Sequence, residues 1–379
     1  MKIKLTAPPR VDATIAMPTS KSISNRALLI SALCSGEFQV MHPALCDDTA
    51  VMIEALSHQD RDVIDVGEAG TAMRFLTAYF ATREGSVTLD GAGRMRQRPI
   101  GVLVDALRTL GARIDYPGEQ GFPPLRIHGP ALHGGDIVSA PYIHMTAAVM
   151  RHMGADVDIA GNRIGIGTGY RGGDYLVEAD WSAAAPWYAL AALLPDSSLI
   201  LQGLNADSIQ GDARLVELGR KLGLETRFDS RGATVDNSHF IGCCCSAFAD
   251  MTSTPDLVPS WVVLLCLLER SFRMTGVRTL RLKESDRIEA LREELLKLGY
   301  VLKIESDDAI SWYGERVKTA PEAPVIDPHG DHRLAMAFAP AAVRFPGLII
   351  ADAPVVSKSY PAYWRHLEQV GFEIEQLAQ

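Results

Sequence analysis

The sequence predicts an α/β protein in which one helix–strand unit is repeated, within a chain long enough for two domains. The unit reads as a helix with apolar residues at helical spacing, then a glycine, then a short strand of alternating polarity. It occurs at 102–116, 145–159, 213–228, 290–305 and, more loosely, 363–376. Such self-similarity indicates one structural unit used several times, and a length of 379 residues favours two domains over one.

The glycines that end these helices show that one repeat is irregular. They are Gly111, Gly154, Gly223, Gly299 and Gly371, at successive intervals of 43, 69, 76 and 72 residues. Three intervals lie near seventy, so the first is short by about thirty residues, which corresponds to about one strand and one helix.

Composition argues against several classes of function. A net charge of −9 is unfavourable for general nucleic-acid binding. Apolar stretches such as 262–268 are too short to span a bilayer, and residues 1–10 carry no targeting pattern, so we expect a cytoplasmic protein without a membrane partner. The six cysteines lack zinc-ligand spacing, so we expect reduced thiols and no bound metal.

Basic residues lie at the start of several expected helices, where the helix dipole disfavours them. Thr19 or Ser20 caps a helix that carries Lys21, Ser22 and Arg26 in its first turns. A cation in a first turn is unfavourable unless an anion offsets it. The other examples are Arg74 after the turn at Gly70; Arg94, Arg96 and Arg98; Lys283 and Arg287; His332 and Arg333; and Lys358. In an acidic protein, this recurrence predicts a shared anionic ligand at helix N-termini.

Acidic residues are interleaved with these cations. Asp180 and Asp256 lie close to basic segments, and Glu284 directly follows Lys283. Asp180 and Asp256 also precede apolar runs and can equally be helix N-caps. Spacing alone therefore does not assign either aspartate to catalysis.

Seven segments, taken together, resemble the motifs of 5-enolpyruvylshikimate-3-phosphate synthases. They are SKSISNRALLISAL (20–33), GEAGTAMRFL (67–76), GRMRQRPIG (93–101), TSTPDLVPS (252–260), LKESDR (282–287), GDHRLAMA (330–337) and SKSYP (357–361). They occur in the order typical of that family, and the resemblance extends from about residue 5 to residue 372. No single segment is specific to this family, but the combination of segments is.

The resemblance implies a fold and a reaction. The fold is a two-domain inside-out α/β barrel, in which each domain has three repeated βαβαββ-like units with helices packed inside the sheets. Residues 1–19 and 179–379 would form the domain that mainly serves phosphoenolpyruvate and catalysis, and residues 20–178 the domain that mainly serves shikimate 3-phosphate. The reaction transfers the enolpyruvyl group of phosphoenolpyruvate to the 5-hydroxyl of shikimate 3-phosphate, through a tetrahedral intermediate and without a cofactor, in the biosynthesis of chorismate and the aromatic amino acids.

Matched position by position, the resemblance implies three sets of site residues. The catalytic set, whose individual acid and base roles stay open, is Asp256, Glu284, Lys21 and Lys358. The shikimate 3-phosphate set is Lys21, Ser22, Arg26, Ser139, Tyr142, Asp256, Thr279 and Lys283. The phosphoenolpyruvate set is Lys21, Gly70, Arg94, Arg287, Arg333 and Lys358.

The chain departs from the family pattern where the short glycine interval lies. Between Ile137 and Val138 it lacks about thirty residues. In the family these residues form a strand and a helix that opens with Ser-Ser-Gln and helps to hold shikimate 3-phosphate. Either the polypeptide truly lacks this segment and is catalytically impaired, or the sequence as written omits an internal segment. The second explanation is favoured, because such a deletion would leave a large void in a repeat core.

Two rival functions fit the sequence less well. The sister transferase that acts on UDP-N-acetylglucosamine carries a cysteine in the loop corresponding to 91–99, whereas no cysteine lies between Cys46 and Cys243 here. A non-catalytic anion-binding descendant is supported only by the missing segment, and the presence of both Asp256 and Glu284 opposes it. The resemblance further implies a monomer and, because Gly70 carries no added methyl group, inhibition by glyphosate in competition with phosphoenolpyruvate.

Overall fold

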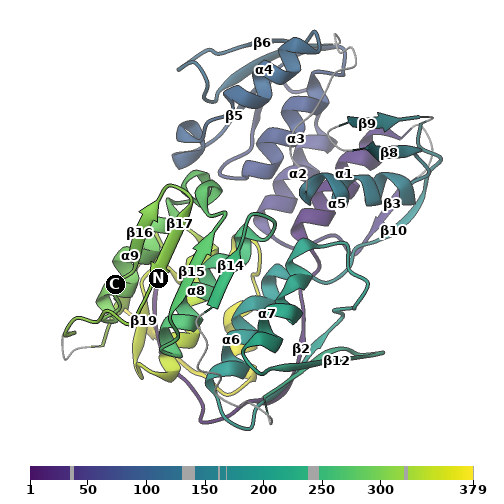
Figure 1. Ribbon diagram of the computed structural model, residues 1–379. Coiled ribbons are helices and arrows are strands. Elements are labelled where there is room, and N and C mark those ends of the chain that lie inside the picture. Colours follow the sequence, from purple (N-terminus) through teal and green to yellow (C-terminus); the bar gives the residue numbers. More distant parts are fainter. Residues whose placement is uncertain are drawn as a thin grey trace. The chain divides into compact units, whose positions relative to one another are not determined.

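The computed structural model describes residues 1–34, 38–129, 141–160, 163–167, 169–237, 247–319 and 323–378. The chain forms two compact units. Unit 1 contains Met1–Pro18 and Glu178–Gln379, and unit 2 contains Thr19–Val177. The chain therefore leaves unit 1 once and returns to it once (Figure 1). No helix within the described ranges is both long enough and apolar enough to cross a membrane.

Unit 1 contains three four-stranded sheets with one common topology, and each sheet has a parallel pair followed by two antiparallel pairings. In sheet order, the first consists of β2 (Asp12–Ala16), β11 (Ser198–Gln202), β13 (Gly232–Asp236) and β12 (Glu225–Asp229). The second consists of β14 (Ala247–Asp250), β15 (Phe272–Thr275), β17 (Ala309–Trp312) and β16 (Lys303–Ser306). The third consists of β18 (Val325–Ile326), β19 (Leu348–Ile350), β1 (Lys2–Thr6) and β20 (Glu373–Leu377).

Three central helices form the interior of unit 1. They are α6 (Ala185–Leu193), α8 (Val258–Leu267) and α10 (His332–Phe338), and every residue of all three is buried. A helix that is apolar on all sides must be enclosed by other elements. The three helices contact one another and share one hydrophobic core with inward-facing strand residues such as Leu5, Leu201 and Phe272. The helices thus lie inside the sheets.

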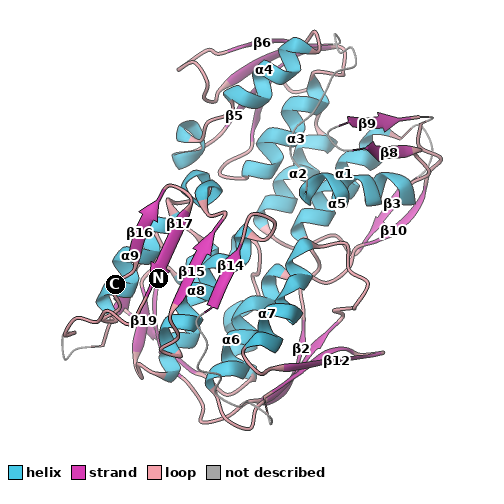
Figure 2. Cartoon of the chain, viewed as in Figure 1, coloured by secondary structure: helices cyan, strands magenta, loops and turns pink. Residues whose placement is uncertain are grey.

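A second helix completes each repeat of unit 1 and is amphipathic or partly exposed. These helices are α7 (Leu215–Lys221), α9 (Arg287–Lys297) and α11 (Tyr363–Gln369). In the second repeat, α8 and α9 lie behind the sheet formed by β14, β15, β17 and β16 (Figure 1), and the alternation of helices and strands is evident in Figure 2. The predicted α/β class and the repeated unit are confirmed, and the sheets of the described residues stay separate rather than closing into one hydrogen-bonded barrel.

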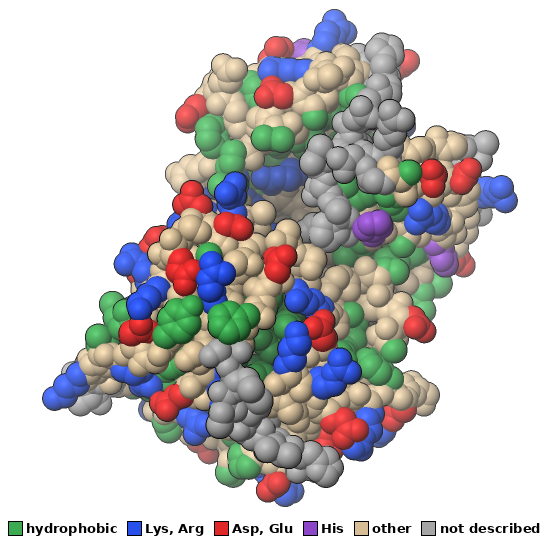
Figure 3. All heavy atoms as spheres, viewed as in Figure 1, with side chains coloured by type: hydrophobic (Ala, Val, Ile, Leu, Met, Phe, Trp, Pro, Cys, Tyr) green, Lys and Arg blue, Asp and Glu red, His purple; other side chains and the backbone are tan. Residues whose placement is uncertain are grey.

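The outer surface of unit 1 is strongly charged. Lysine and arginine side chains lie beside aspartate and glutamate side chains on the face seen in Figure 3. Exposed ion pairs such as Arg273–Glu305 and Lys303–Glu315 belong to this surface. Pairs of this kind are screened by solvent and contribute little to stability.

Unit 2 contains one complete repeat and two shorter ones among its described residues. The complete repeat is β4 (Val63–Asp65), α3 (Gly70–Phe80), β5 (Gly85–Asp90), α4 (Gly101–Thr109), β6 (Arg113–Asp115) and β7 (Leu125–Gly129), with sheet order β4-β5-β7-β6. One shorter repeat has β10 (Gly173–Leu176) parallel to β3 (Phe38–Met41), with α1 (Lys21–Leu33) and α2 (Asp47–Ser57). The other has α5 (Pro141–His152), β8 (Val157–Ala160) and β9 (Arg163–Ile166).

The second shorter repeat of unit 2 is the one that the glycine interval marks as irregular. Its described residues contain one antiparallel pair but no counterpart of the parallel pair seen in every sheet of unit 1. The position between Ile137 and Val138, where about thirty residues were expected to be missing, lies outside the described residues.

Candidate active site

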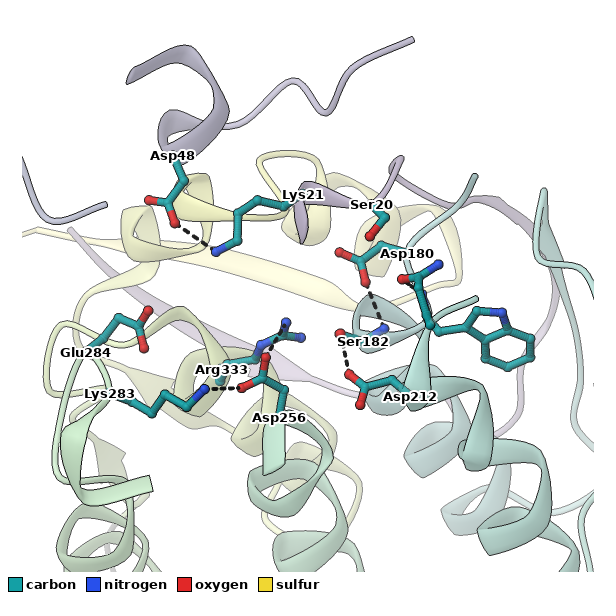
Figure 4. Close-up of polar contacts among 12 residues, drawn as sticks. Ser20, Lys21, Asp48, Asp180, Ser182, Asp212, Asp256, Lys283, Glu284 and Arg333 are labelled. Carbon is teal, nitrogen blue, oxygen red and sulfur yellow. Dashed lines mark hydrogen bonds and ion pairs between the residues drawn. The ribbon is translucent and has the colours of Figure 1, made fainter. Parts of the chain in front are cut away.

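The charged residues of unit 1 gather where the three central helices begin. The short 3₁₀ helix η2 (Ser182–Ala184) leads into α6, and η4 (Pro255–Leu257) leads into α8. The carboxylate of Asp331 caps α10 by accepting a hydrogen bond from the backbone N–H of Arg333 at 2.8 Å. An ion pair between Asp256 Oδ2 and an Arg333 guanidinium nitrogen, 3.6 Å apart, joins the starts of α8 and α10 (Figure 4). Helix N-termini carry partial positive charge, which adds to the attraction of this region for anions.

Arg287 holds three carboxylates at once. Its guanidinium contacts Asp331 at 2.7 Å, Asp256 at 2.9 Å and Glu284 at 2.9 Å, and its side chain is only 2% exposed. Burial alone would lower the pKa of this guanidinium, but the three carboxylates raise it above its ordinary value. The planar fork of arginine allows these simultaneous contacts, which an ammonium group could not reproduce.

Asp256 is surrounded by cations. Besides Arg287 and Arg333, the Lys283 ammonium lies 3.4 Å from its carboxylate (Figure 4). Burial raises the pKa of the Asp256 carboxyl, but the three cations outweigh burial and hold that pKa well below its usual range. Asp256 is therefore ionised at neutral pH, and its basicity is suppressed as long as all three cations face it.

A second carboxyl close to Asp256 behaves differently. The hydroxyl of Ser182 donates a hydrogen bond to Asp212, and the backbone N–H of Ser182 donates to Asp180 Oδ1 at 2.8 Å (Figure 4). Burial raises the pKa of Asp212 most, the Asp256 carboxylate raises it further, and the Ser182 hydroxyl lowers it, which leaves it at about 7. Two neighbouring carboxyls thus differ in protonation, an arrangement that suits acid–base chemistry.

Two other predicted residues of unit 1 lie on adjoining segments. Lys358 ends η7 (Ala353–Lys358) and donates to the backbone carbonyl of Gly330 at 2.9 Å, directly before the Asp331 cap. Thr279 lies on η5 (Arg278–Leu282), close in sequence to Lys283, and is exposed. Of the predicted set, the structure thus connects Asp256, Lys283, Glu284, Arg287 and Arg333 by direct contacts.

In unit 2, the predicted residues of α1 are fixed by polar contacts. Lys21 is the first residue of the helix, and its ammonium lies 2.9 Å from Asp48, with both side chains about nine-tenths buried. Arg26 donates to Thr146 Oγ1 at 2.8 Å and to the backbone carbonyl of Ser22 at 2.7 Å. These contacts hold two cations at the N-terminal end of α1. The Asp48 carboxylate offsets the repulsion between the Lys21 ammonium and the positive end of the helix dipole.

The start of α3 shows why Gly70 must lack a side chain. A β-carbon at Gly70 would lie 2.4 Å from a guanidinium nitrogen of Arg98, which is buried. Arg94, on η1 (Gly93–Gln97), is exposed, whereas Arg96 pairs with Asp90 at 2.7 Å. The three arginines of this segment therefore have three different environments.

Some functional candidates escaped the sequence reasoning, and others cannot be placed. Asp48 and Asp212 are absent from the predicted site, because no local pattern distinguishes them from ordinary surface residues or caps. Arg98 belongs to the predicted group of basic residues at helix starts but not to the sets of site residues that the resemblance implies. Ser139 lies outside the described residues, as does the side chain of Tyr142, which belongs to α5.

One group of possible metal ligands occurs within the described residues. Glu293, Glu294 and His329 have ligand atoms within 4.8 Å of one another. The Glu294 carboxylate, however, already accepts hydrogen bonds from Lys297 Nζ at 2.6 Å and the backbone N–H of Asp327 at 3.0 Å, and it contacts His329 at 3.0 Å. Since its side chain is 1% exposed, we interpret the group as an anchor between α9 and the segment before α10.

Comparisons with known proteins agree on one family. The profile of the family described as EPSP synthase (3-phosphoshikimate 1-carboxyvinyltransferase) matches residues 5–61, 56–138 and 129–367. A 3-phosphoshikimate 1-carboxyvinyltransferase of Bacteroides fragilis is 43% identical over 411 aligned positions, which cover 99% of each chain. One of Syntrophobacter fumaroxidans is 35% identical over 419 positions, which cover 95% of this chain and 97% of the relative.

Solved structures agree with this result at the level of fold. An EPSP synthase from Acinetobacter baumannii has a TM-score of 0.76 at 21% identity and covers 99% of this chain and 100% of its own. The enolpyruvyl transferase NikO from Streptomyces tendae also has a TM-score of 0.76, at 15% identity, with 100% and 99% covered. The alignment to the Bacteroides relative has 411 positions, so at least 32 of them (411 minus 379) have no residue in this chain.

Proposed function

Because this chain belongs to the EPSP synthase family, we infer that it is an enzyme that transfers the enolpyruvyl group of phosphoenolpyruvate to the 5-hydroxyl of shikimate 3-phosphate. The products are 5-enolpyruvylshikimate 3-phosphate and phosphate, and the reaction belongs to the shikimate pathway. The single observation of the site that best supports this chemistry is the Asp256 carboxylate, held by three cations beside the start of a buried helix.

The reaction imposes two physical demands on the site. The 5-hydroxyl must lose its proton and attack C2 of phosphoenolpyruvate while C3 gains a proton, which gives a tetrahedral ketal phosphate. The C3 methyl group then loses a proton and phosphate leaves. Both steps need groups that exchange acid and base roles, and both substrates need fixed cations around their negative charges.

Asp256 fits the role of the base that takes the proton from the 5-hydroxyl. In the ligand-free protein its pKa is well below the usual range, so it is a weak base. If Arg287 and Arg333 pair with bound anions, they stabilise the Asp256 carboxylate less. The pKa of Asp256 then rises, so that it becomes a stronger base when both substrates are bound. The proposed catalytic set is completed by Glu284, Lys21 and Lys358. Of these, Glu284 contacts the Arg287 guanidinium, which also contacts Asp256.

The binding roles follow the chemistry of the side chains. For phosphoenolpyruvate the proposed residues are Lys21, Gly70, Arg94, Arg287, Arg333 and Lys358. For shikimate 3-phosphate they are Lys21, Ser22, Arg26, Ser139, Tyr142, Asp256, Thr279 and Lys283. Two unit charges 4 Å apart attract by about 4 kcal/mol at an effective dielectric near 20, so several such pairs can hold two mutually repelling anions.

One specific observation favours a second candidate, a catalytically impaired homologue. Unit 2 has two shortened repeats among its described residues, and at least 32 aligned positions of the Bacteroides relative (411 minus 379) have no counterpart here. If the absent positions include the wall that holds the phosphate of shikimate 3-phosphate, the 379-residue chain binds that substrate weakly.

A direct assay separates the two candidates. The 379-residue protein is mixed with shikimate 3-phosphate and phosphoenolpyruvate, and release of inorganic phosphate is followed with time. We expect phosphate release that depends on both substrates, and we expect Asp256→Asn to remove it. Absence of release at millimolar substrate, with the folded protein verified by circular dichroism, would establish the impaired homologue instead.

Three finer properties belong to the same proposal. Glyphosate is expected to compete with phosphoenolpyruvate, because Gly70 carries no added methyl group and so resembles the glycine of the glyphosate-sensitive type. The protein is expected to be a monomer and to act in the cytoplasm. Steady-state inhibition kinetics and sedimentation analysis test the first two of these expectations.

A further inference from the structure

Asp212 belongs to none of the proposed catalytic or binding sets. Its carboxyl lies beside the charged residues around Arg333, which we call the Arg333 cluster. It lies on η3 (Gly211–Arg214) and accepts a hydrogen bond from the Ser182 hydroxyl. Within the described part of the chain, Asp212 makes no ion pair. Figure 4 shows its carboxylate beside the Ser182 hydroxyl, and the Asp256 carboxylate is one of the charges that act on it.

The charges around Arg333 do not balance when every group is ionised. The carboxylates are those of Asp180, Asp212, Asp256, Glu284 and Asp331, whereas the cations are Lys283, Arg287, Arg333 and Lys358. One negative charge is thus in excess before any ligand arrives, and a phosphorylated ligand adds more. A buried excess of negative charge favours protonation of the carboxyl that is least well paired.

Asp212 is that carboxyl. Asp256, Glu284 and Asp331 all contact the guanidinium of Arg287. Asp180 and Asp212 make no ion pair among the described residues: Asp180 accepts a hydrogen bond from the backbone N–H of Ser182, and Asp212 accepts one from the neutral Ser182 hydroxyl. Of these two, Asp212 is the one whose pKa is raised. The groups that act on Asp212 come from three other segments: Asp180 and Ser182 before α6, Asp256 on η4, and Arg333 on α10. The charged residue beside it on its own segment is Arg214. Arg214 contacts the backbone carbonyl of Asp250 and the Glu217 carboxylate, so it is engaged elsewhere.

We propose that Asp212 is a positioning residue that takes up a proton when a phosphorylated anion binds at Arg333, so that the cluster does not accumulate negative charge as its ligand arrives. The proposal rests on the proposed function only in requiring that Arg333 bind an anion. Protonated Asp212 stops competing for Arg333, which can then direct its charge to the ligand. By linkage, the anion and the proton strengthen each other's binding.

The position of Asp212 on the pH scale makes this coupling relevant to function. Its pKa of about 7 means that both forms are populated near neutral pH in the ligand-free protein. An anion that raises this pKa by one unit would cause uptake of about half a proton at pH 7.5, and its affinity would fall about sevenfold between pH 6.5 and pH 9.

The test uses sulfate, because sulfate does not titrate between pH 6 and 9 and any proton uptake must come from the protein. Isothermal titration calorimetry in buffers of different ionisation enthalpy counts the protons that accompany sulfate binding. We compare the wild type with Asp212→Asn, which resembles the protonated carboxyl. Asp207→Asn is the matched control, because Asp207 is an exposed aspartate in the connection that precedes η3.

The expected results distinguish Asp212 from the other acids. Wild type and Asp207→Asn take up about half a proton on binding sulfate at pH 7.5, whereas Asp212→Asn takes up none and keeps its sulfate affinity as the pH rises to 9. In Ser182→Ala, loss of the hydroxyl that lowers the pKa of Asp212 shifts the loss of affinity to higher pH. This second variant also keeps the proposal testable if Asp212→Asn fails to fold.

Three outcomes overturn the proposal. They are sulfate binding by the wild type without proton uptake, unchanged uptake in Asp212→Asn, and the absence of any sulfate binding. None of these outcomes bears on the proposed function if phosphate release from the two substrates is normal. Conversely, proton-linked sulfate binding without turnover supports the role of Asp212 and points to the impaired homologue.

Discussion

Replacement of Arg287 by methionine tests whether the guanidinium stabilises the three carboxylates that contact it. Arg287 is 2% exposed in its side chain, and the Asp331 side chain is fully buried. Methionine fills similar space but leaves Asp256, Glu284 and Asp331 without their shared cation. Breaking a buried ion pair by removing one partner costs about 3–5 kcal/mol, so Arg287→Met should lower the free energy of unfolding by at least this amount at pH 8.

The pH dependence of this loss gives a sharper test than its size. In the wild type the cations hold the pKa of Asp256 well below its usual range, so this carboxylate contributes stability above about pH 4, which is lost as the pH falls further. In Arg287→Met the carboxylates that remain buried have raised pKa values and bind protons at mildly acidic pH. The deficit of the variant relative to the wild type should therefore be smaller at pH 5 than at pH 8.

The assay can report on unit 1 alone. All five tryptophans lie in unit 1, at positions 181, 187, 261, 312 and 364. Urea unfolding followed by tryptophan fluorescence therefore measures the unit that contains Arg287. The matched control is Arg273→Met, which breaks the exposed pair with Glu305 and should cost no more than about 1 kcal/mol. A deficit for Arg287→Met of similar size, or one that is equal at pH 5 and pH 8, would refute the reasoning.

Three further predictions follow from the same site. Asp256→Asn should lower kcat at least about 100-fold, because asparagine has a similar size to aspartate but cannot act as a base. A kcat within tenfold of the wild-type value in the phosphate-release assay would exclude Asp256 as the base. Gly70→Ala places a β-carbon 2.4 Å from the Arg98 guanidinium, so it should raise KM for phosphoenolpyruvate and weaken glyphosate inhibition together, and unchanged values of both constants would contradict it. Asp212 has its pKa raised to about 7, so the folded state holds more protons than the unfolded state and stability falls between about pH 4 and pH 7; the urea midpoint of Asp212→Asn relative to the wild type should rise from pH 5 to pH 8, and a constant difference would count against the raised pKa.

The repeated unit could be predicted from the sequence because half-exposed helices carry a periodic pattern. The five predicted segments coincide with α4–β6, α5–β8, α7–β12, α9–β16 and α11–β20. In each case an amphipathic helix ends near a glycine and a short strand follows. Alternation of polar and apolar residues exists only where one side of an element meets solvent, so these elements are visible in the sequence.

The central helices were not recognised as repeats for the same physical reason. α6, α8 and α10 are buried on all sides, so their sequences are mainly apolar and lack the alternating polar face that would reveal them as repeats. Two residues of the candidate site nevertheless lie where central helices begin, Asp256 on η4 before α8 and Arg333 on α10. The motif resemblance located the site, whereas the repeat pattern located only the second helix of each unit.

The network within the site could not be predicted from local spacing. Arg287 contacts Asp331 and Asp256, which are 44 and 31 residues away in sequence, and Lys21 contacts Asp48 at a distance of 27 residues. Such contacts depend on how separate repeats pack, and an aspartate such as Asp212 has the same local sequence features as any aspartate near a helix start. Only the assembled structure distinguishes Asp256, whose pKa lies well below the usual range, from Asp212, whose pKa is raised to about 7.

The two N-terminal strands of unit 1 have a consequence for the synthesis of the protein. β1 pairs with β19 and β20, so residues 2–6 can complete their sheet only after residues 348–377 have been synthesised, whereas β2 pairs with β11 and can do so once residues 198–202 have been made. Residues 19–177, in contrast, are contiguous and can collapse while translation continues. Such long-range pairing is slow to form, so the nascent chain carries residues 2–6 without their partner strands until residues 348–377 have left the ribosome.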